Sequence, residues 1–385
     1  MKLDKVNVGL VGLGLVSHSH LKAYLSHSDA KVIAVCDMDE ERAKTVSGKY
    51  GIPKYYTDYE QMLKDPEINT VDIATPTYRH IPMTIAAAQA GKNILCEKPF
   101  CLTLKEGEDA CLEVEKRKVS LMVGESYLFM SSILKAHELI ASGEIGKPKQ
   151  IRERFSAWVE RPGVIDNRHG AKDQGWRMDS QRAGGNGFPW MYDHCVHFFS
   201  TAEFFMSGSH ISEVYSITAG KCESNWQQSP ELDVPIMTWK YEDPACQGVW
   251  MRAEPHNGKF DTMTGFSATI IGENGMVEVL GEGGGGLQWQ GKDVHLVLHR
   301  KGKESLTFRF DEGGDDVWES EISYYSQAHI NQIHNFIETL TKGERPKYSG
   351  DDGVRAIRNT MAAICSAKEG IPVKVCEANE DRMNR

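Results

Sequence analysis

Lys98 is the residue with the clearest potential for chemistry in this sequence. It ends a short apolar run, NILCEK at residues 93–98, and Pro99 follows it. A lysine just past the carboxyl end of a parallel strand lies where open α/β sheets bind ligands. Removed from water, its ammonium group can hold a substrate hydroxyl and stabilise the charge that develops on that oxygen. A solvated lysine at a strand end is the simpler alternative.

Thr75, Pro76 and His80, which precede Lys98 in the sequence, are expected at the same edge of the sheet. Thr75 and Pro76 end the run VDIATP, and His80 stands near the start of the helical pattern that follows. Because the carboxyl ends of parallel strands meet at one edge, we expect these residues to face one crevice. For His80, a packing or helix-capping role competes with a role at the site.

A second constellation lies in the segment GWRMDSQRAGGNGFPWMYDHCVHFF, residues 175–199. Asp193 precedes His197 by four residues, a spacing that places both side chains on one face of a helix. An imidazole is a natural general base for an alcohol proton, and a nearby carboxylate stabilises its protonated form. Ordinary packing of a buried helix is one alternative. A divalent metal on Asp193, His194 and His197 is another, disfavoured because no further ligand stands at a standard spacing.

A glycine turn precedes both constellations. Gly12-Leu13-Gly14 follows the first apolar run, where a tight turn and a helix N-terminus favour a pyrophosphate, although Ser17 replaces the third glycine of GxGxxG. Asp37 ends the second run, where a carboxylate can accept hydrogen bonds from a ribose diol and repels a 2'-phosphate. We therefore expect NAD, and NADP is less favoured, although Arg42 could accompany a 2'-phosphate.

The elements that must position these residues alternate in type. Strands are expected at residues 6–13, 31–37, 71–75, 93–98 and 120–126, and helices after Gly14 and at 39–50, 59–63, 80–91 and 104–117. This alternation predicts a parallel sheet covered by helices, a Rossmann domain at residues 1–125.

The pattern changes beyond Tyr127. A helix at residues 133–142 and several period-two segments between 150 and 281 predict an α+β domain, residues 126–385, with a large, mostly antiparallel open sheet. The glycine tract at 283–286 is expected to be a turn, because no helix follows it. Helices at 322–340 and 350–369 and the strand-like IPVKV close the chain, and these last helices could pack back on the Rossmann domain.

Composition excludes several classes of partner. The net charge of -10 provides no basic surface for nucleic acid or an anionic membrane. The nine cysteines include no CxxC pair, which favours reduced thiols and a cytoplasmic protein. No membrane span or signal peptide is expected, because no apolar run approaches about 18 residues.

The chain resembles the glucose-fructose oxidoreductase / inositol dehydrogenase family (Gfo/Idh/MocA) of nicotinamide-dependent enzymes. The resemblance covers essentially the whole chain: the GLG turn, the acid at Asp37, TPTYRH, AGKNILCEKP, the WR pair, the D-x-x-x-H pair and GIPVKV. It implies a catalytic constellation in which His197 takes the hydroxyl proton, Lys98 holds the oxygen and Asp193 completes the set. It also implies an α/β domain whose sheet often forms subunit contacts, hence a homo-oligomer.

The expected site residues fall into two groups, with no metal ligand. The cofactor-binding group is Gly12, Gly14, Leu15, Val16, Asp37, Thr75, Pro76, His80, Glu97, Lys98, Glu125, Trp176 and Arg177. The substrate-binding group is Lys98, Tyr127, Tyr192, Asp193 and His197. The sequence departs from the family pattern at GGNGFPWMYD, which has two extra residues before Asp193, and at Glu125-Ser126-Tyr127, where Asn or Tyr usually follows VG. Both departures fall at the pocket, so the substrate need not be the family's commonest one.

These features favour an NAD-dependent oxidoreductase that acts on a ring secondary alcohol of a sugar, inositol or glycoside. Oxidation of the 3-hydroxyl of a glucoside is a narrower hypothesis. It draws on Trp158, Trp176, Trp190 and Tyr192, which suit stacking on a pyranose but could equally fill a core. One alternative is a glycosidase or lyase that retains NAD and oxidises the ring transiently. A non-catalytic sugar-sensing regulator is disfavoured, because Lys98, Asp193 and His197 are all present.

Overall fold

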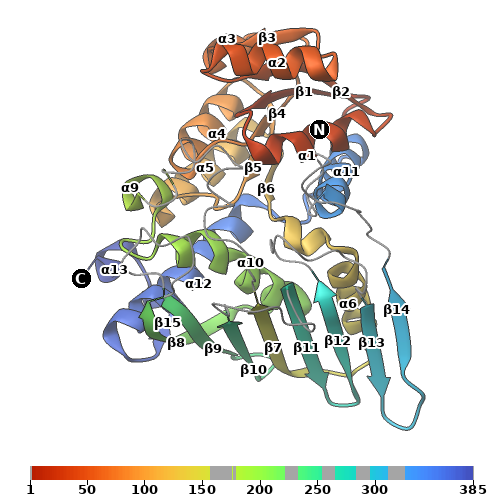
Figure 1. Ribbon diagram of the computed structural model, residues 1–385, viewed down its shortest axis with the longest axis vertical. Coiled ribbons are helices and arrows are strands. Elements are labelled where there is room, and N and C mark those ends of the chain that lie inside the picture. Colours follow the sequence, from red (N-terminus) through yellow and green to blue (C-terminus); the bar gives the residue numbers. More distant parts are fainter. Residues whose placement is uncertain are drawn as a thin grey trace. The chain divides into compact units, whose positions relative to one another are not determined.

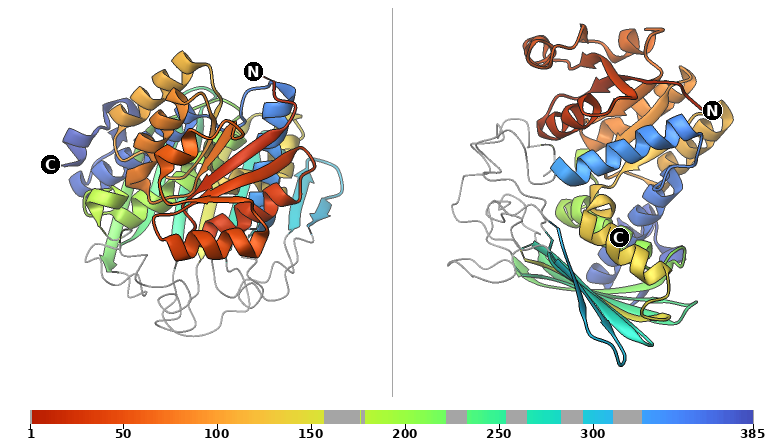
Figure 2. Two further views of the ribbon diagram at one scale, coloured as in Figure 1. Left: turned by 90° about the horizontal axis from the view of Figure 1, so that it is seen from above. Right: turned by 90° about the vertical axis from the view of Figure 1, so that its right-hand side faces the viewer.

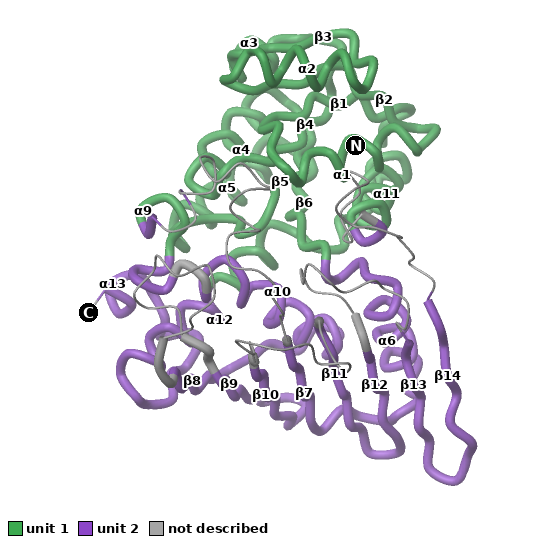
Figure 3. The backbone as a smooth tube through the Cα atoms, viewed as in Figure 1, with its two compact units in different colours: residues 1–126, 181–184, 329–357 green, residues 127–180, 185–328, 358–385 purple. Residues whose placement is uncertain are grey.

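The computed structural model describes residues 2–156, 176, 179–221, 233–253, 265–282, 295–310 and 326–384. The chain forms two compact units (Figure 3). Unit 1 comprises residues 1–126, 181–184 and 329–357, and unit 2 comprises residues 127–180, 185–328 and 358–385. The expected glycine tract at 283–286 and residues 322–325 of an expected helix lie outside the described residues.

Unit 1 is built on a six-stranded parallel sheet with the order β3-β2-β1-β4-β5-β6. The strands are β1 (Val6–Val11), β2 (Ala30–Cys36), β3 (Lys54–Tyr56), β4 (Thr70–Ile73), β5 (Asn93–Glu97) and β6 (Leu121–Gly124). Strands β1, β4, β5 and β6 are almost entirely buried, as expected for strands covered on both faces. The strand order reverses between β1 and β4, the point at which doubly wound sheets bind ligands.

Helices alternate with these strands (Figure 1). They are α1 (Leu15–Leu25), α2 (Glu40–Tyr50), α3 (Tyr59–Leu63), α4 (His80–Gln89) and α5 (Leu104–Arg117), with a 3-10 turn η1 (Thr77–Arg79) before α4. Local sequence determines where two of these helices begin: Asp39 caps α2, and Thr103 and Glu106 form a capping box on α5. The expected Rossmann fold is confirmed, and β3 is an additional strand that the sequence did not suggest.

A segment from the end of the chain completes unit 1. It begins within α11 (Ser326–Lys342) and ends within α12 (Gly350–Glu369). The backbone of Leu3 donates a hydrogen bond to the Leu340 carbonyl oxygen at 3.0 Å, and Val123 donates one to the Tyr348 carbonyl oxygen at 3.0 Å. Residues 329–357 are therefore bonded to both ends of the N-terminal segment.

Unit 2 contains a nine-stranded sheet with the order β14-β13-β12-β11-β7-β10-β9-β8-β15. The strands are β7 (Pro148–Ser156), β8 (Ile211–Lys221), β9 (Asp233–Tyr241), β10 (Cys246–Ala253), β11 (Gly265–Gly272), β12 (Gly275–Glu282), β13 (His295–Arg300), β14 (Leu306–Arg309) and β15 (Val373–Lys374). All neighbouring pairs are antiparallel except β7 with β10. The expected mostly antiparallel sheet is confirmed, with β13 and β14 as additional strands.

Helices cover one face of this sheet. They include α6 (Ser131–Ala141), α10 (Pro189–Phe205) and α12, and α6 and α12 lie on the same side of the strands (Figure 2). The short helices α9 (Ser180–Ala183) and α13 (Glu380–Met383) and the 3-10 turns η2 (Ser126–Phe129) and η4 (Val375–Glu377) complete the assignment. In the described part of the chain, no helix has the length and hydropathy needed to span a membrane.

Candidate functional site

The glycine turn between β1 and α1 has the geometry that a bound pyrophosphate requires. Gly12 has a φ of +88°, and a Cβ there would lie 2.5 Å from the carbonyl oxygen of Ala74, directly after the neighbouring strand β4. Gly14 is the N-cap of α1 and provides no side-chain cap, and among the described residues nothing beyond its chain neighbours lies within 4 Å of the place a Cβ would take. The first N–H groups of α1 are thus accessible to an anion, with Leu15 half exposed and Val16 partly buried beside them.

The Ser17 hydroxyl donates to the carbonyl oxygen of Gly14 at 2.6 Å, and its side chain is fully buried. Ser17 takes the position of the third glycine of the motif, but its side chain is buried and is not at the surface where the phosphate is expected.

Asp37 stands directly after β2 and is held by the backbone of two loops. Its Oδ2 accepts a hydrogen bond from the Leu13 backbone N–H at 2.9 Å, and its Oδ1 accepts one from the Asp39 backbone N–H at 2.9 Å. Arg42 Nη1 lies 3.5 Å from Oδ2. The carboxylate is thereby fixed beside the glycine turn, as the binding of a ribose diol requires.

The residues after β4 and β5 are joined by one imidazole. His80 is buried, with Nδ1 at 2.8 Å from the Pro99 carbonyl oxygen and Nε2 at 2.7 Å from the Thr75 carbonyl oxygen. Burial lowers the pKa of His80, although both carbonyl oxygens act in the opposite direction. The ring therefore positions the main chain around Thr75, Pro76 and the partly buried Lys98.

Two acidic residues at the ends of β5 and β6 lie inside unit 1. Glu97 is 8% exposed, and its Oε1 lies 3.3 Å from Nε2 of His20. Burial by itself would raise the pKa of Glu97, but His20, His329 and Lys98 together lower it. Glu125, directly after β6, is also buried. The carboxylate of Glu97 is thus engaged with a histidine that the sequence analysis did not select.

Unit 2 carries the second constellation on α10. The helix includes Tyr192, Asp193 and His197, which confirms the helix on which their spacing was interpreted. All three side chains are buried, at 0%, 5% and 6% exposed. The ring of His197 stacks on that of Tyr127 with centroids 4.0 Å apart and planes 14° from parallel. Tyr127, expected at the substrate site, is therefore a direct neighbour of the expected base.

The glycine-rich bend before α10 has three glycines with positive φ, at Gly184, Gly185 and Gly187. At Gly185 a Cβ would lie 2.5 Å from the Phe188 carbonyl oxygen, so the bend depends on glycine there.

Asp193 Oδ2 lies 3.2 Å from Nδ1 of His194. In the described part of the chain, the group of potential metal ligands whose ligand atoms lie close together is not on α10. It consists of His20, Glu97 and His329.

Some expected residues can be placed only in part. Trp176 is partly buried, whereas Arg177 and Trp158 lie outside the described residues, and nothing is assigned to the Trp190 side chain. Lys98 belongs to unit 1, and Asp193 and His197 belong to unit 2, so the convergence of the three stays a prediction. The expected residues of unit 1 all lie at or just after the carboxyl ends of strands or begin the helix after a strand.

A doubly wound parallel sheet, an uncapped helix start beside a required glycine and an acid after the second strand define a dinucleotide-binding domain, here joined to an α/β domain. A model of the "Oxidoreductase family, NAD-binding Rossmann fold" matches residues 6–125, and a model of that family's C-terminal alpha/beta domain matches residues 137–375. The chain belongs to this family, Gfo/Idh/MocA, and is an NAD-dependent oxidoreductase.

Similar proteins support this assignment. The chain is 35% identical over 373 residues to D-apiose dehydrogenase from Paraburkholderia graminis, covering 95% of this chain and 88% of that protein. It is 25% identical over 377 residues to myo-inositol 2-dehydrogenase from Thermotoga maritima, covering 97% and 99%. The solved structure of levoglucosan dehydrogenase with NADH and levoglucosan has a TM-score of 0.78 at 20% identity, covering 96% and 99%, a likeness of fold.

Proposed function

We propose that the protein transfers a hydride between nicotinamide and a ring secondary alcohol of a sugar or polyol. The observation that carries the proposal is that Gly12, Asp37, Thr75 and Lys98 follow the carboxyl ends of four adjacent parallel strands, β2-β1-β4-β5, on either side of the point where the strand order reverses. The 35% identity to a sugar dehydrogenase over nearly the whole chain favours a sugar or cyclic polyol as substrate. A glycoside is a narrower possibility within this class.

Bound NAD would supply the hydride acceptor or donor, and the residues of this chain are assigned the proton and the oxygen. We assign Lys98 to hold the reacting hydroxyl, because a partly buried ammonium group stabilises charge that develops on oxygen. We assign His197 to take the hydroxyl proton, since its ring is buried and stacked on Tyr127. Asp193, one turn earlier on α10, lies on the same face of the helix and is assigned to complete the set.

The test is an absorbance assay at 340 nm with NAD or NADP and three substrate panels: inositols, free aldoses and glucosides. We expect NADH with at least one panel, and the reactive panel identifies the substrate class. Lys98→Met should lower kcat by about a hundredfold or more while NAD binding is retained. Lys105→Met is the matched control, because Lys105 lies in unit 1 with its side chain 81% exposed.

Two other outcomes would redirect the assignment. Release of an aglycone without net NADH would replace it with the glycosidase or lyase that retains its cofactor. Turnover in Lys98→Met equal to that of the natural chain would overturn the role of Lys98, while leaving the NAD-binding residues unaffected.

A further inference from the structure

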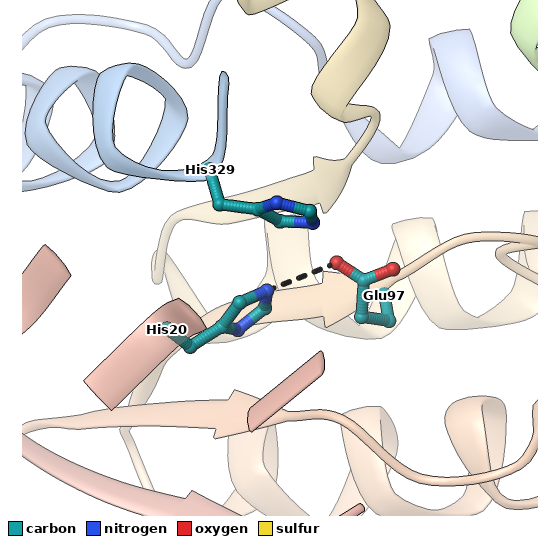
Figure 4. A group of neighbouring side chains, drawn as sticks. All are labelled: His20, Glu97 and His329. Carbon is teal, nitrogen blue, oxygen red and sulfur yellow. Dashed lines mark ion pairs between the residues drawn. The ribbon is translucent and has the colours of Figure 1, made fainter. Parts of the chain in front are cut away.

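A buried polar cluster lies within unit 1, and its two histidines have no role in the proposed hydride transfer, whereas Glu97 is also among the expected cofactor-binding residues. It consists of His20 on α1, Glu97 at the end of β5 and His329 on α11, all buried (Figure 4). One nitrogen or oxygen of each side chain lies within 4.8 Å of those of the others. The three side chains point toward one another from elements distant in the sequence (Figure 4).

We propose that His20, Glu97 and His329 bind a divalent transition-metal ion of the zinc type. Two imidazoles and one carboxylate form a donor set that Zn²⁺ accepts readily, with His–Zn and Glu–Zn distances of about 2.0–2.2 Å. At those lengths the ligand atoms of a tetrahedral ion are separated by about 3.3 Å. Nε2 of His20 and Oε1 of Glu97 are 3.3 Å apart.

Nε2 of His20 and Oε1 of Glu97 form a buried ion pair when the imidazole is protonated, and a shared cation is the other arrangement that suits their 3.3 Å separation. Neither atom makes a hydrogen bond of ordinary geometry to any described residue. Buried polar atoms are usually hydrogen-bonded, so two such atoms facing one space call for an explanation. A cation between their lone pairs supplies one.

His20 also has the outer partner that metal-binding histidines usually have. Its Nδ1 lies 2.9 Å from Oδ2 of Asp72, and both side chains are fully buried. Donation of the Nδ1 proton to Asp72 leaves Nε2 directed at Glu97 and His329. A carboxylate behind a histidine fixes the orientation of the ring and strengthens it as a ligand.

The charges of the cluster agree with a divalent cation. Asp72 and Glu97 bring two carboxylates into the interior, and buried charges require compensation. A dication with two neutral imidazoles balances them. The alternative source of positive charge is a second proton on each histidine, which is the competing explanation that the experiment must separate from metal.

The surroundings leave room for the ion and offer a fourth donor. A Cβ at Gly124 would lie 2.5 Å from Oε1 of Glu97, so glycine there keeps the space beside the carboxylate open. Gln332, one turn after His329 on α11, is fully buried, and neither its amide oxygen nor its amide nitrogen has a hydrogen-bond partner among the described residues. Its oxygen could complete a tetrahedral set.

The experiment measures metal directly on the full chain. The protein is produced in medium supplemented with Zn²⁺, dialysed, and analysed by inductively coupled plasma mass spectrometry. It is then stripped with a chelator and titrated with Co²⁺, whose visible absorption reports tetrahedral nitrogen and oxygen coordination. We expect close to one equivalent of Zn²⁺, a Co²⁺ spectrum, and a lower melting temperature after chelation.

Two variants on one helix localise the ion. His329→Gln should abolish the Co²⁺ spectrum and the effect of the chelator on melting. His334→Gln is the matched control, because His334 also lies on α11 but hydrogen-bonds to the Ala23 carbonyl oxygen outside the cluster. Circular dichroism and NAD binding establish that each variant is folded.

The proposal fails if the natural chain takes up neither Zn²⁺ nor Co²⁺, in which case protons balance the two carboxylates. It also fails if folded His329→Gln binds Co²⁺ as the natural chain does. The measurement on the natural chain needs no variant, so it decides the question even if His329→Gln does not fold. Neither result bears on hydride transfer, which the 340 nm assay tests separately.

Discussion

The backbone N–H of Leu13 donates a 2.9 Å hydrogen bond to the carboxylate of Asp37, joining the glycine turn after β1 to the acid after β2. The second oxygen accepts from the Asp39 backbone, so the carboxylate is held at both oxygens. A fixed negative charge at this place accepts hydrogen bonds from a ribose diol and repels a 2'-phosphate.

Asp37→Ser should weaken NAD binding by about 10- to 100-fold, the cost of losing hydrogen bonds to a charged group. NADP binding should improve, because the repulsion is gone and Arg42 lies nearby. Fluorescence titration with both dinucleotides measures the change. Exposed Glu41→Gln is the control, and an unchanged ratio of NAD to NADP affinity in Asp37→Ser would contradict the role of Asp37.

Replacement of Gly12 by alanine should lower stability, whereas replacement of Gly14 by alanine should weaken NAD binding. Gly12→Ala places a methyl group 2.5 Å from a backbone oxygen at a φ of +88°, so we expect the free energy of unfolding to fall by about 2 kcal/mol or more. Gly14→Ala meets no atom of the described residues within 4 Å apart from its chain neighbours, and should fold normally. It should nevertheless weaken NAD binding, because the backbone approaches the pyrophosphate there.

Chemical denaturation and NAD titration of the two variants separate these effects. Full NAD affinity in Gly14→Ala would show that the pyrophosphate does not lie against this residue.

Glu153 in the middle of β7 is buried at 1% exposed, and neither of its oxygens has a hydrogen-bond partner among the described residues. Tyr241 on β9 is a neighbouring titratable group whose pKa is raised first by burial and also by Glu203 and Glu153. Burial raises the pKa of Glu153 well above its ordinary value. The folded state therefore holds a proton that the unfolded state releases near pH 4.3.

The contribution of this group to stability is complete below about pH 4.3 and is lost as the pH rises through the raised pKa of the folded state. Glu153→Gln should remove that dependence and stabilise unit 2 by about 1 kcal/mol or more at pH 8. Urea midpoints at pH 5 and pH 8 measure this, with exposed Glu304→Gln as the control. An equal pH dependence in Glu153→Gln and the natural chain would show that Glu153 is not the group responsible.

The expected homo-oligomer has a specific candidate surface. Ile217, Ile236 and Met251 are 50%, 47% and 43% exposed, and they are paired across β8, β9 and β10. A contiguous apolar patch of this kind is typical of an interface. Ile236→Glu should lower the mass measured by light scattering to that of one chain. Leu112→Glu, at another exposed apolar residue, should leave it unchanged. A monomeric natural chain would refute the oligomer.

The sequence by itself determined the local elements and the residues at their ends. The period of apolar residues sets the bounds of α5 and α12 as observed, because a helix depends on neighbours three and four residues away. The glycine turn and Asp37 were identified for a similar reason: each occupies a fixed place next to a strand. The short strand β3 was not predicted, because a strand of three residues shows too little periodicity.

Only the tertiary structure decided which distant segments meet. The parallel pairing of β7 with β10, the inclusion of residues 329–357 in unit 1 and the convergence of His20, Glu97 and His329 all depend on long-range contacts. No local pattern distinguishes His329 from a surface histidine, and the charged sequence around Glu153 gives no sign that its carboxyl group is buried. Sequence periodicity reports which face of an element is apolar, whereas burial of a particular polar group depends on what packs against that face.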